Sequence, residues 1–178
     1  DTPHYENVPF EVPDGWGWTT VENICSKIGS GSTPKGSNYA PDGILFFRSQ
    51  NVYNDGVVLE DIKYISEEVF LQIKNYTISK DDLYVTIAGT IGVTGEVPTE
   101  LDGMNLTENA VKITNIQINK NYLCLIIQSE FVQQQFQDKT HQVAMPKLAL
   151  ERILSTLIPV CTITTQSAMV SKFVEMDS

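Results

Sequence analysis

The sequence has little that would place it in a membrane, a disulfide framework or a zinc site. Its 178 residues include only three cysteines and two histidines, with no CxxC pair. Three cysteines cannot all pair internally, and two distant histidines lack the ligand spacing of a structural zinc site. The longest apolar run, 122–127, is far shorter than the ~18 residues that span a bilayer. We therefore expect a cytoplasmic protein with buried, reduced thiols and no metal site.

Basic residues are also scarce, which bears on nucleic-acid binding. Lys and Arg number 12 against 22 Asp and Glu, and a net charge of −10 provides no bulk attraction to DNA. The bases gather in two windows. The first, 27–48, has a net charge of +2 from Lys27, Lys35 and Arg48 against Asp42. The second, 139–172, has a net charge of +3 from Lys139, Lys147, Arg152 and Lys172 against Glu151.

The rest of the composition is that of an ordinary globular domain. Hydrophobic residues make up 42 % of the chain, and a chain of this length suits one domain with a self-sufficient core. The sequence begins at Asp1 rather than Met. Its first residues are acids and prolines, without the positive segment of a secretory signal. We expect an excised or processed piece of a longer chain.

Periodicity and turn residues predict a strand-rich, mixed α/β (α+β) fold. Helices are expected at 20–28, 66–74, 121–139 and 148–153, and from a cap at Thr165 onward. Strands are expected at 44–48, 57–59, 83–88, 91–97, 110–113 and 155–160. The last helix has an apolar stripe that stops with the chain: Met169, Val170, Phe173 and Val174. We expect this stripe to self-associate or to dock against another surface.

Two glycine-rich stretches lack the spacing of nucleotide-binding motifs. In the loop at 29–37, Gly36 is followed by Ser37 rather than Lys, and the loop leads toward a strand instead of a helix N-terminus. The second stretch has GxxGxxG spacing within strand-like sequence, at Gly89, Gly92 and Gly95. This pattern favours a tight strand–turn–strand with close backbone packing.

Catalytic signatures are sparse. No serine lies in a GxSxG elbow, and nothing connects Cys25 with His141 as a nucleophile and its base. A Mg²⁺-dependent nuclease is an alternative, because two short fragments fit a PD…DxK pattern: Pro41-Asp42 and Asp61-Ile62-Lys63. A protein-interaction module without a DNA role is a third reading.

Polar side chains in and beside the basic windows are of the types that contact phosphates and base edges. Arg suits guanine, Asn and Gln suit adenine, and Ser and Thr suit either. One group comprises Ser32, Thr33, Lys35, Arg48, Ser49, Gln50 and Asn51. The other comprises Lys139, His141, Gln142 and Lys147. By composition alone these segments could equally be ordinary polar loops.

The order of several short segments resembles a target-recognition domain of the specificity (S) subunit of type I restriction-modification enzymes. The similarity extends over nearly the whole chain. Its segments are Val8–Trp18 (VPFEVPDGWGW), Gly31-Ser32-Thr33-Pro34, Phe47-Arg48-Ser49-Gln50-Asn51-Val52, Ala88-Gly89-Thr90-Ile91-Gly92, Met145-Pro146-Lys147-Leu148, Leu157-Ile158-Pro159 and Thr165-Gln166.

This resemblance implies a non-catalytic, double-stranded DNA recognition domain at 1–164. In the family, two such domains each read half of a split site, and long helices between them hold two modification subunits. Residues 165–178 would begin that inter-domain coiled-coil spacer. S-adenosylmethionine, ATP and Mg²⁺ would bind the modification and restriction subunits, and no cofactor would bind this chain. The resemblance adds Thr90 to the DNA contacts and assigns subunit contact to Met169, Val170, Phe173 and Val174.

Overall fold

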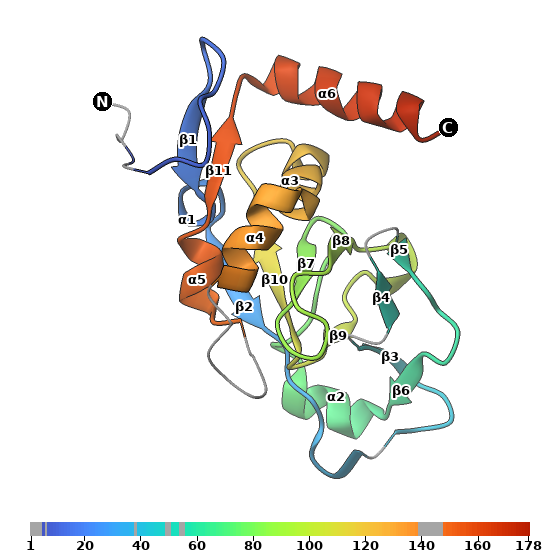
Figure 1. The fold of residues 1–178 in the computed structure, drawn as a ribbon. Coiled ribbons are helices and arrows are strands. Elements are labelled where there is room, and N and C mark those ends of the chain that lie inside the picture. The colour runs from blue at the N-terminus through green and yellow to red at the C-terminus, as the bar shows by residue number, and fades with distance from the viewer. Residues whose placement is uncertain (1–4, 6, 38, 49–50, 54–55, 139–147) are drawn as a thin grey trace.

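A four-stranded antiparallel sheet forms the centre of the computed structural model, which describes residues 5, 7–37, 39–48, 51–53, 56–138 and 148–178. Its strand order is β2 (Lys27–Ser30), β10 (Ala110–Thr114), β7 (Leu83–Thr86) and β8 (Thr94–Glu96). One face is covered by helices, as Figure 1 shows: α1 (Val21–Ile24), α3 (Lys120–Gln128), α4 (Glu130–Asp138) and α5 (Leu150–Leu154). The predicted mixed α/β class is confirmed.

Alternation along β7 places side chains in two different cores. Leu83 and Val85 point into the larger core beneath the helices, whereas Tyr84 packs in a second core on the opposite face. The second core also receives residues from β4 (Val52–Tyr53), β5 (Gly56–Val57) and the 3₁₀ turn η3 (Thr99–Leu101). The sheet is therefore buried on both faces.

A smaller, three-stranded sheet lies beside the central one, with β3 (Ile44–Phe47) between β6 (Lys63–Ile65) and β9 (Asn105–Leu106). Helix α2 (Glu67–Ile73) follows β6, and Phe46, Ile65 and Ile73 form a third buried cluster there. The Ser66 side chain caps α2 by accepting a hydrogen bond from the Val69 amide, as the sequence predicts. A 3₁₀ turn, η1 (Lys35–Ser37), precedes this sheet.

A strand near the start of the chain pairs with one near its end, and only the later strand was predicted from the sequence. β1 (Gly17–Thr20) pairs antiparallel with β11 (Leu157–Val160), the strand expected at 155–160. Phe10, before β1, and Trp18, within β1, pack edge-to-face against Phe131 of α4. After β11, helix α6 (Ile163–Met176) runs across the top of α3 (Figure 1).

Three expected helix boundaries are wrong. The helix expected at 20–28 ends at Ile24, because Cys25 is extended and 27–30 pairs with β10 as a strand. The helix expected at 121–139 breaks at Ser129, whose ψ of 149° ends α3 and lets its carbonyl accept the first hydrogen bonds of α4. The last helix is capped by Thr162 rather than by Thr165, whose amide is the capped group.

None of the helices in the described part of the chain is both long enough and apolar enough to span a membrane.

Candidate nucleic-acid interface

Two parallel strands bring two loops that are distant in sequence to one edge of the smaller sheet. β3 pairs with β9 in parallel, with Phe46 opposite Asn105. Because parallel strands end on the same side, Arg48 after β3 and the turn 107–109 after β9 leave the sheet together. They border a pocket of about 200 Å³ lined by Thr33, Tyr39, Phe46, Arg48, Thr107, Glu108 and Asn109.

A close backbone approach fixes the glycine-rich loop against this edge. The Ser32 amide donates to the Leu106 carbonyl oxygen at 2.9 Å. A Cβ atom at Gly31 would overlap the carbonyl oxygens of Leu106 and Thr107, so the approach requires glycine. The loop therefore packs on the backbone of the neighbouring strand and does not cradle a phosphate.

Two of the three predicted contact residues of this loop, Ser32 and Thr33, lie at the same edge, and Lys35 lies farther along, against α2. Ser32 and Thr33 are half-buried, whereas Lys35 is exposed. The Glu108 amide donates to Thr33 Oγ1 at 3.5 Å, which joins the loop to the 107–109 turn. All three predicted residues also line a groove of about 560 Å³ against α2.

Arg48 occupies the expected strand-to-loop corner, and there it pairs with an acid. One guanidinium nitrogen donates to the Asp61 carboxylate at 3.1 Å and to the Asp61 carbonyl oxygen at 2.7 Å. The Lys63 ammonium group binds the other carboxylate oxygen. Hydrogen bonds from Lys63 and then from Arg48 hold the pKa of Asp61 below its usual value. Only 15 % of the Arg48 side chain is exposed.

Asn51, expected among the DNA contacts, instead organises the loop between β3 and β6. Its side chain is 2 % exposed, and its amide nitrogen donates to the carbonyl oxygens of Val58 and Glu60 at 3.2 and 3.4 Å. The Val58 amide donates in return to the Asn51 carbonyl oxygen at 2.8 Å. The Asn51 side chain is buried and held by these hydrogen bonds, so it is not exposed to a base edge and is not part of the DNA face.

Half of the predicted contacts lie outside the described residues: Ser49, Gln50, Lys139, His141, Gln142 and Lys147. The structure nevertheless fixes where the second of these segments rejoins the domain. The Leu148 amide donates to the Ile87 carbonyl oxygen at 2.9 Å, and the Ile87 amide donates to the Asn109 carbonyl oxygen at 2.8 Å. Leu148 is thus connected through Ile87 to Asn109, in the turn that lines the same pocket as Arg48.

Thr90 is exposed in the turn that connects β7 with β8. Gly89 and Gly92 have φ values of 79° and 82°, which explains the glycine spacing. The Gly92 amide donates to the Thr86 carbonyl oxygen at 2.8 Å and closes the turn. The predicted strand–turn–strand is confirmed. Thr90, like Ile87, comes after the C-terminal end of β7.

The geometry gives no support to the nuclease alternative. Both carboxylate oxygens of Asp61 bind cationic side chains, Arg48 and Lys63, rather than facing a second carboxylate. Across the described ranges there is no cluster of three His, Cys, Asp or Glu residues that could hold a metal ion.

Comparison with known proteins accounts for this arrangement of loops. Residues 13–178 match the model of the type I restriction modification DNA specificity domain. The chain belongs to this family. The specificity domain is similar to two curated Escherichia coli proteins, the type I restriction enzyme EcoAI specificity subunit, at 22 % identity over 177 residues, and the EcoBI specificity subunit, at 26 % over 172. It covers 30 % and 36 % of their respective lengths, about one third.

Solved structures share the fold. The crystal structure of the HsdS subunit from Thermoanaerobacter tengcongensis matches 94 % of the specificity domain with a TM-score of 0.71 at 18 % identity. The S subunit of M. genitalium matches with a TM-score of 0.61 at 11 % identity. The match covers 43 % of the first chain and 41 % of the second.

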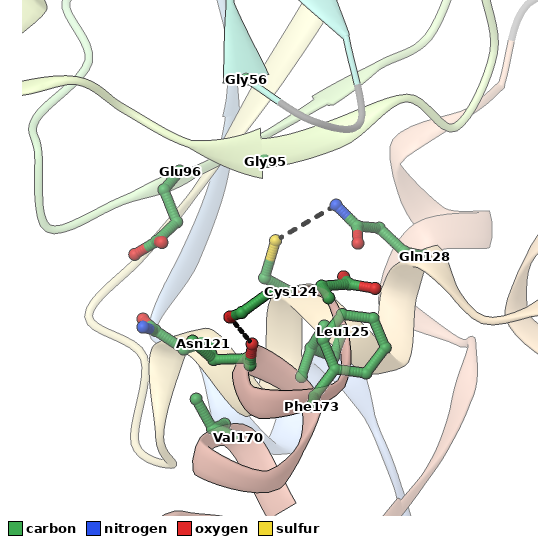
Figure 2. A pocket seen from close by; sticks show the side chains of 12 residues that line it. Gly56, Gly95, Glu96, Asn121, Cys124, Leu125, Gln128, Val170 and Phe173 are labelled. Carbon is green, nitrogen blue, oxygen red and sulfur yellow. Dashed lines mark hydrogen bonds between the residues drawn. The ribbon is translucent and has the colours of Figure 1, made fainter.

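A second surface lies on the opposite side of the larger core, between α6 and α3. Figure 2 shows its deeper part, where Phe173 and Val170 of α6 face Cys124 and Leu125 of α3, with Glu96 of β8 above. This groove has a volume of about 440 Å³. The predicted subunit-contact residues differ in exposure: Met169, Phe173 and Val174 are exposed, and Val170 is half-buried. Docking of the apolar stripe on the domain covers it only in part.

The base of α6 is tied to α3 by one buried amide. Gln166 is 1 % exposed; its side-chain oxygen accepts from the Asn119 amide at 2.9 Å, and its nitrogen donates to the Cys161 carbonyl oxygen at 2.8 Å. Asn119 in turn caps α3. The Thr165-Gln166 pair that contributes to the family resemblance therefore connects the two helices.

The 107–109 turn is the part of the interface that the sequence did not reveal. Thr107, Glu108 and Asn109 lie between two short strands in a stretch with no basic residue and no motif. These residues lie beside Arg48 because two residues of β9 pair in parallel with two residues of β3. So short a pairing leaves no local pattern in the sequence.

Proposed function

We propose that this domain recognises one half of a split target site in double-stranded DNA, as part of a type I restriction-modification specificity subunit. In this role it directs methyltransferase and restriction subunits to the site. The proposal rests on family membership and on the loops that converge at one edge of the domain. These loops carry Thr33, Lys35 and Arg48, and Leu148, the residue that follows 139–147, bonds to Ile87 beside them.

The observation that carries the proposal is a chain of hydrogen bonds across this edge, two between backbone groups and one from a backbone amide to the Thr33 hydroxyl. Leu148 bonds to Ile87, Ile87 bonds to Asn109, and the amide next to Asn109 bonds to Thr33. Leu148, which directly follows residues 139–147 of the second basic window, thereby lies on the same side of the domain as Thr33 of the first window. A DNA face requires this proximity, because phosphate contacts that set register and base contacts that read sequence must reach the same duplex.

We further propose that the domain is non-catalytic and binds no cofactor of its own. S-adenosylmethionine, ATP and Mg²⁺ would belong to the partner subunits. In the described residues both carboxylate oxygens of Asp61 bind cationic side chains, which fits a recognition role better than metal-dependent catalysis. The free thiols also support a cytoplasmic location.

Helix α6 would begin the spacer that joins two recognition domains and contacts the modification subunits. Three apolar side chains of its stripe remain exposed beyond its docked base: Met169, Phe173 and Val174. In the longer subunit a partner helix would bury them, which is the usual reason for such a stripe at helical spacing.

Binding of the reconstituted modification complex to a half-site library at two salt concentrations tests the proposal. Lys35→Ala and Lys147→Ala should each weaken binding to all sequences alike and lower the salt slope by about 1, as expected for lost phosphate contacts. Gln50→Ala should cost about 1–3 kcal/mol on the cognate half-site and relax one base position.

Lys80→Ala is the matched control, because Lys80 is exposed and precedes β7, at the end of the strand opposite Ile87. The same loss of charge there should leave the salt slope unchanged. Equal slopes for all the lysine variants, together with an unchanged base preference for Gln50→Ala, would contradict the proposed DNA face.

A further inference from the structure

The 107–109 turn is rigidly held, although it lies between strands of only a few residues. The Asn109 amide donates to Thr107 Oγ1 at 3.3 Å, and the Asn109 carbonyl oxygen accepts from Ile87. The Glu108 amide donates to Thr33. One of these hydrogen bonds closes the turn on itself and the other two join it to the segments of Ile87 and Thr33, so the turn is preorganised before any ligand arrives.

Glu108 is the exposed member of this turn. Thr107 is 4 % exposed and Asn109 is half-buried, whereas Glu108 faces solvent. Within the described ranges no ion pair or side-chain hydrogen bond involves its carboxylate. An exposed carboxylate on a fixed backbone, at the mouth of a pocket that Arg48 also lines, is available to a ligand.

The chemistry of the pocket restricts that ligand. A carboxylate is only an acceptor, and phosphates repel it, so on a DNA face it must meet a base-edge donor. In the major groove two bases present an amino donor, cytosine at N4 and adenine at N6. Only the partner of cytosine, guanine, presents the two acceptors O6 and N7 that suit an arginine. Opposite charges on one small pocket, Glu108 and Arg48, complement the edge of one C·G pair.

We propose that Glu108 is a specificity-determining residue that reads the cytosine of a C·G pair in the half-site, with its carboxylate accepting from cytosine N4. The proposal rests on the proposed DNA-recognition function. It adds to the two basic windows a third, acidic segment, which the composition of the chain did not suggest.

The test uses the full-length specificity subunit assembled with its modification subunits and a library of half-sites. Glu108→Ala should reduce discrimination against the other bases at one position by about 5- to 150-fold. Glu108→Gln keeps the shape but presents an amide that can donate, so that position should also accept thymine, whose O4 is an acceptor. A shift from cytosine toward thymine is a readout that a merely structural role would not move.

Glu100→Gln is the matched control, because Glu100 is an exposed carboxylate on η3. The segment after η3 bonds through the Gly103 amide to Ile78, which precedes β7. The variant removes the same charge at the far end of that strand and should leave base preference unchanged. A wild-type complex that selects sequences while both Glu108 variants keep its full preference would overturn this inference alone. A wild-type complex without sequence preference would overturn the proposed function together with it.

Discussion

The Arg48 guanidinium group donates to both the carboxylate and the backbone carbonyl oxygen of Asp61. Asp61 adopts a left-handed backbone with φ of 57°, which an L residue other than glycine seldom adopts. In this conformation the carboxylate and the backbone carbonyl oxygen of Asp61 both accept hydrogen bonds from the Arg48 guanidinium group. In the DNA-free domain Asp61 thus competes with any phosphate or guanine for the arginine.

Asp61→Asn should therefore strengthen DNA binding by the complex. Asparagine tolerates the left-handed backbone and removes the charge that holds Arg48, so the freed guanidinium should add one contact and steepen the salt slope by about 1. Asp81→Asn makes the same charge change on an exposed residue before β7 and should have little effect. Equal binding by both variants and the wild type at two salt concentrations would show that Arg48 has no part in DNA contact.

Gly31→Ala should destabilise the domain by more than about 3 kcal/mol. The added Cβ would meet two backbone carbonyl oxygens that cannot move without breaking the β3–β9 edge. Gly29→Ala is the control, because its Cβ would make an ordinary contact 3.6 Å from the Lys112 side chain and should change stability by less than about 1 kcal/mol. Denaturant unfolding of the two variants measures the difference, and similar midpoints would contradict the close packing of the loop.

Gln166→Ala should cost about 1–3 kcal/mol, since it leaves the Asn119 amide and the Cys161 carbonyl oxygen without their buried partner. The loss should appear as faster amide exchange in the first turn of α6. Ser171→Ala, at an exposed position further along α6, should change the stability by less than about 0.5 kcal/mol. If exchange in α6 is the same in both variants, Gln166 does not hold the helix to α3.

Cys124 should be the least reactive of the three thiols. Burial between α3 and β8 raises its pKa to about 12, and burial also raises the pKa of Cys25 and of Cys161, both of which are more exposed. A higher pKa leaves less thiolate at pH 8, so alkylation of Cys124 by iodoacetamide should be more than about tenfold slower in the folded domain than after unfolding. Mass mapping of modified peptides measures this, and rapid labelling of the folded domain at pH 8 would contradict the burial of Cys124 between α3 and β8.

Several elements were predictable because they carry local signals. Ser66 before two glutamates predicts α2, and β-branched runs predict β7 and β10. The break at Ser129 was not, because the apolar period continues through it and only the packing of two short helices on one sheet requires a turn. β1 and β2 were missed as strands, since four residues beside a helix cap carry no alternation long enough to detect.

The candidate site was predictable in part for the same reason. Arg48 was expected at a strand-to-loop corner from a short apolar run, and the structure places it there. Its ion pair with Asp61, the burial of Asn51 and the position of Glu108 depend on tertiary contacts between residues 7 to 75 positions apart. No spacing in the sequence encodes such contacts.

Exchange of this domain within the native specificity subunit tests the central claim most directly. Residues 13–162 would be replaced by the matching segment of a family member that recognises a different site, and the sites modified by the assembled methyltransferase would be read from a randomised duplex library. The account predicts that one half of the recognised site changes to that of the donor while the other half and the modification activity persist. An unchanged recognition site, with activity retained, would contradict it.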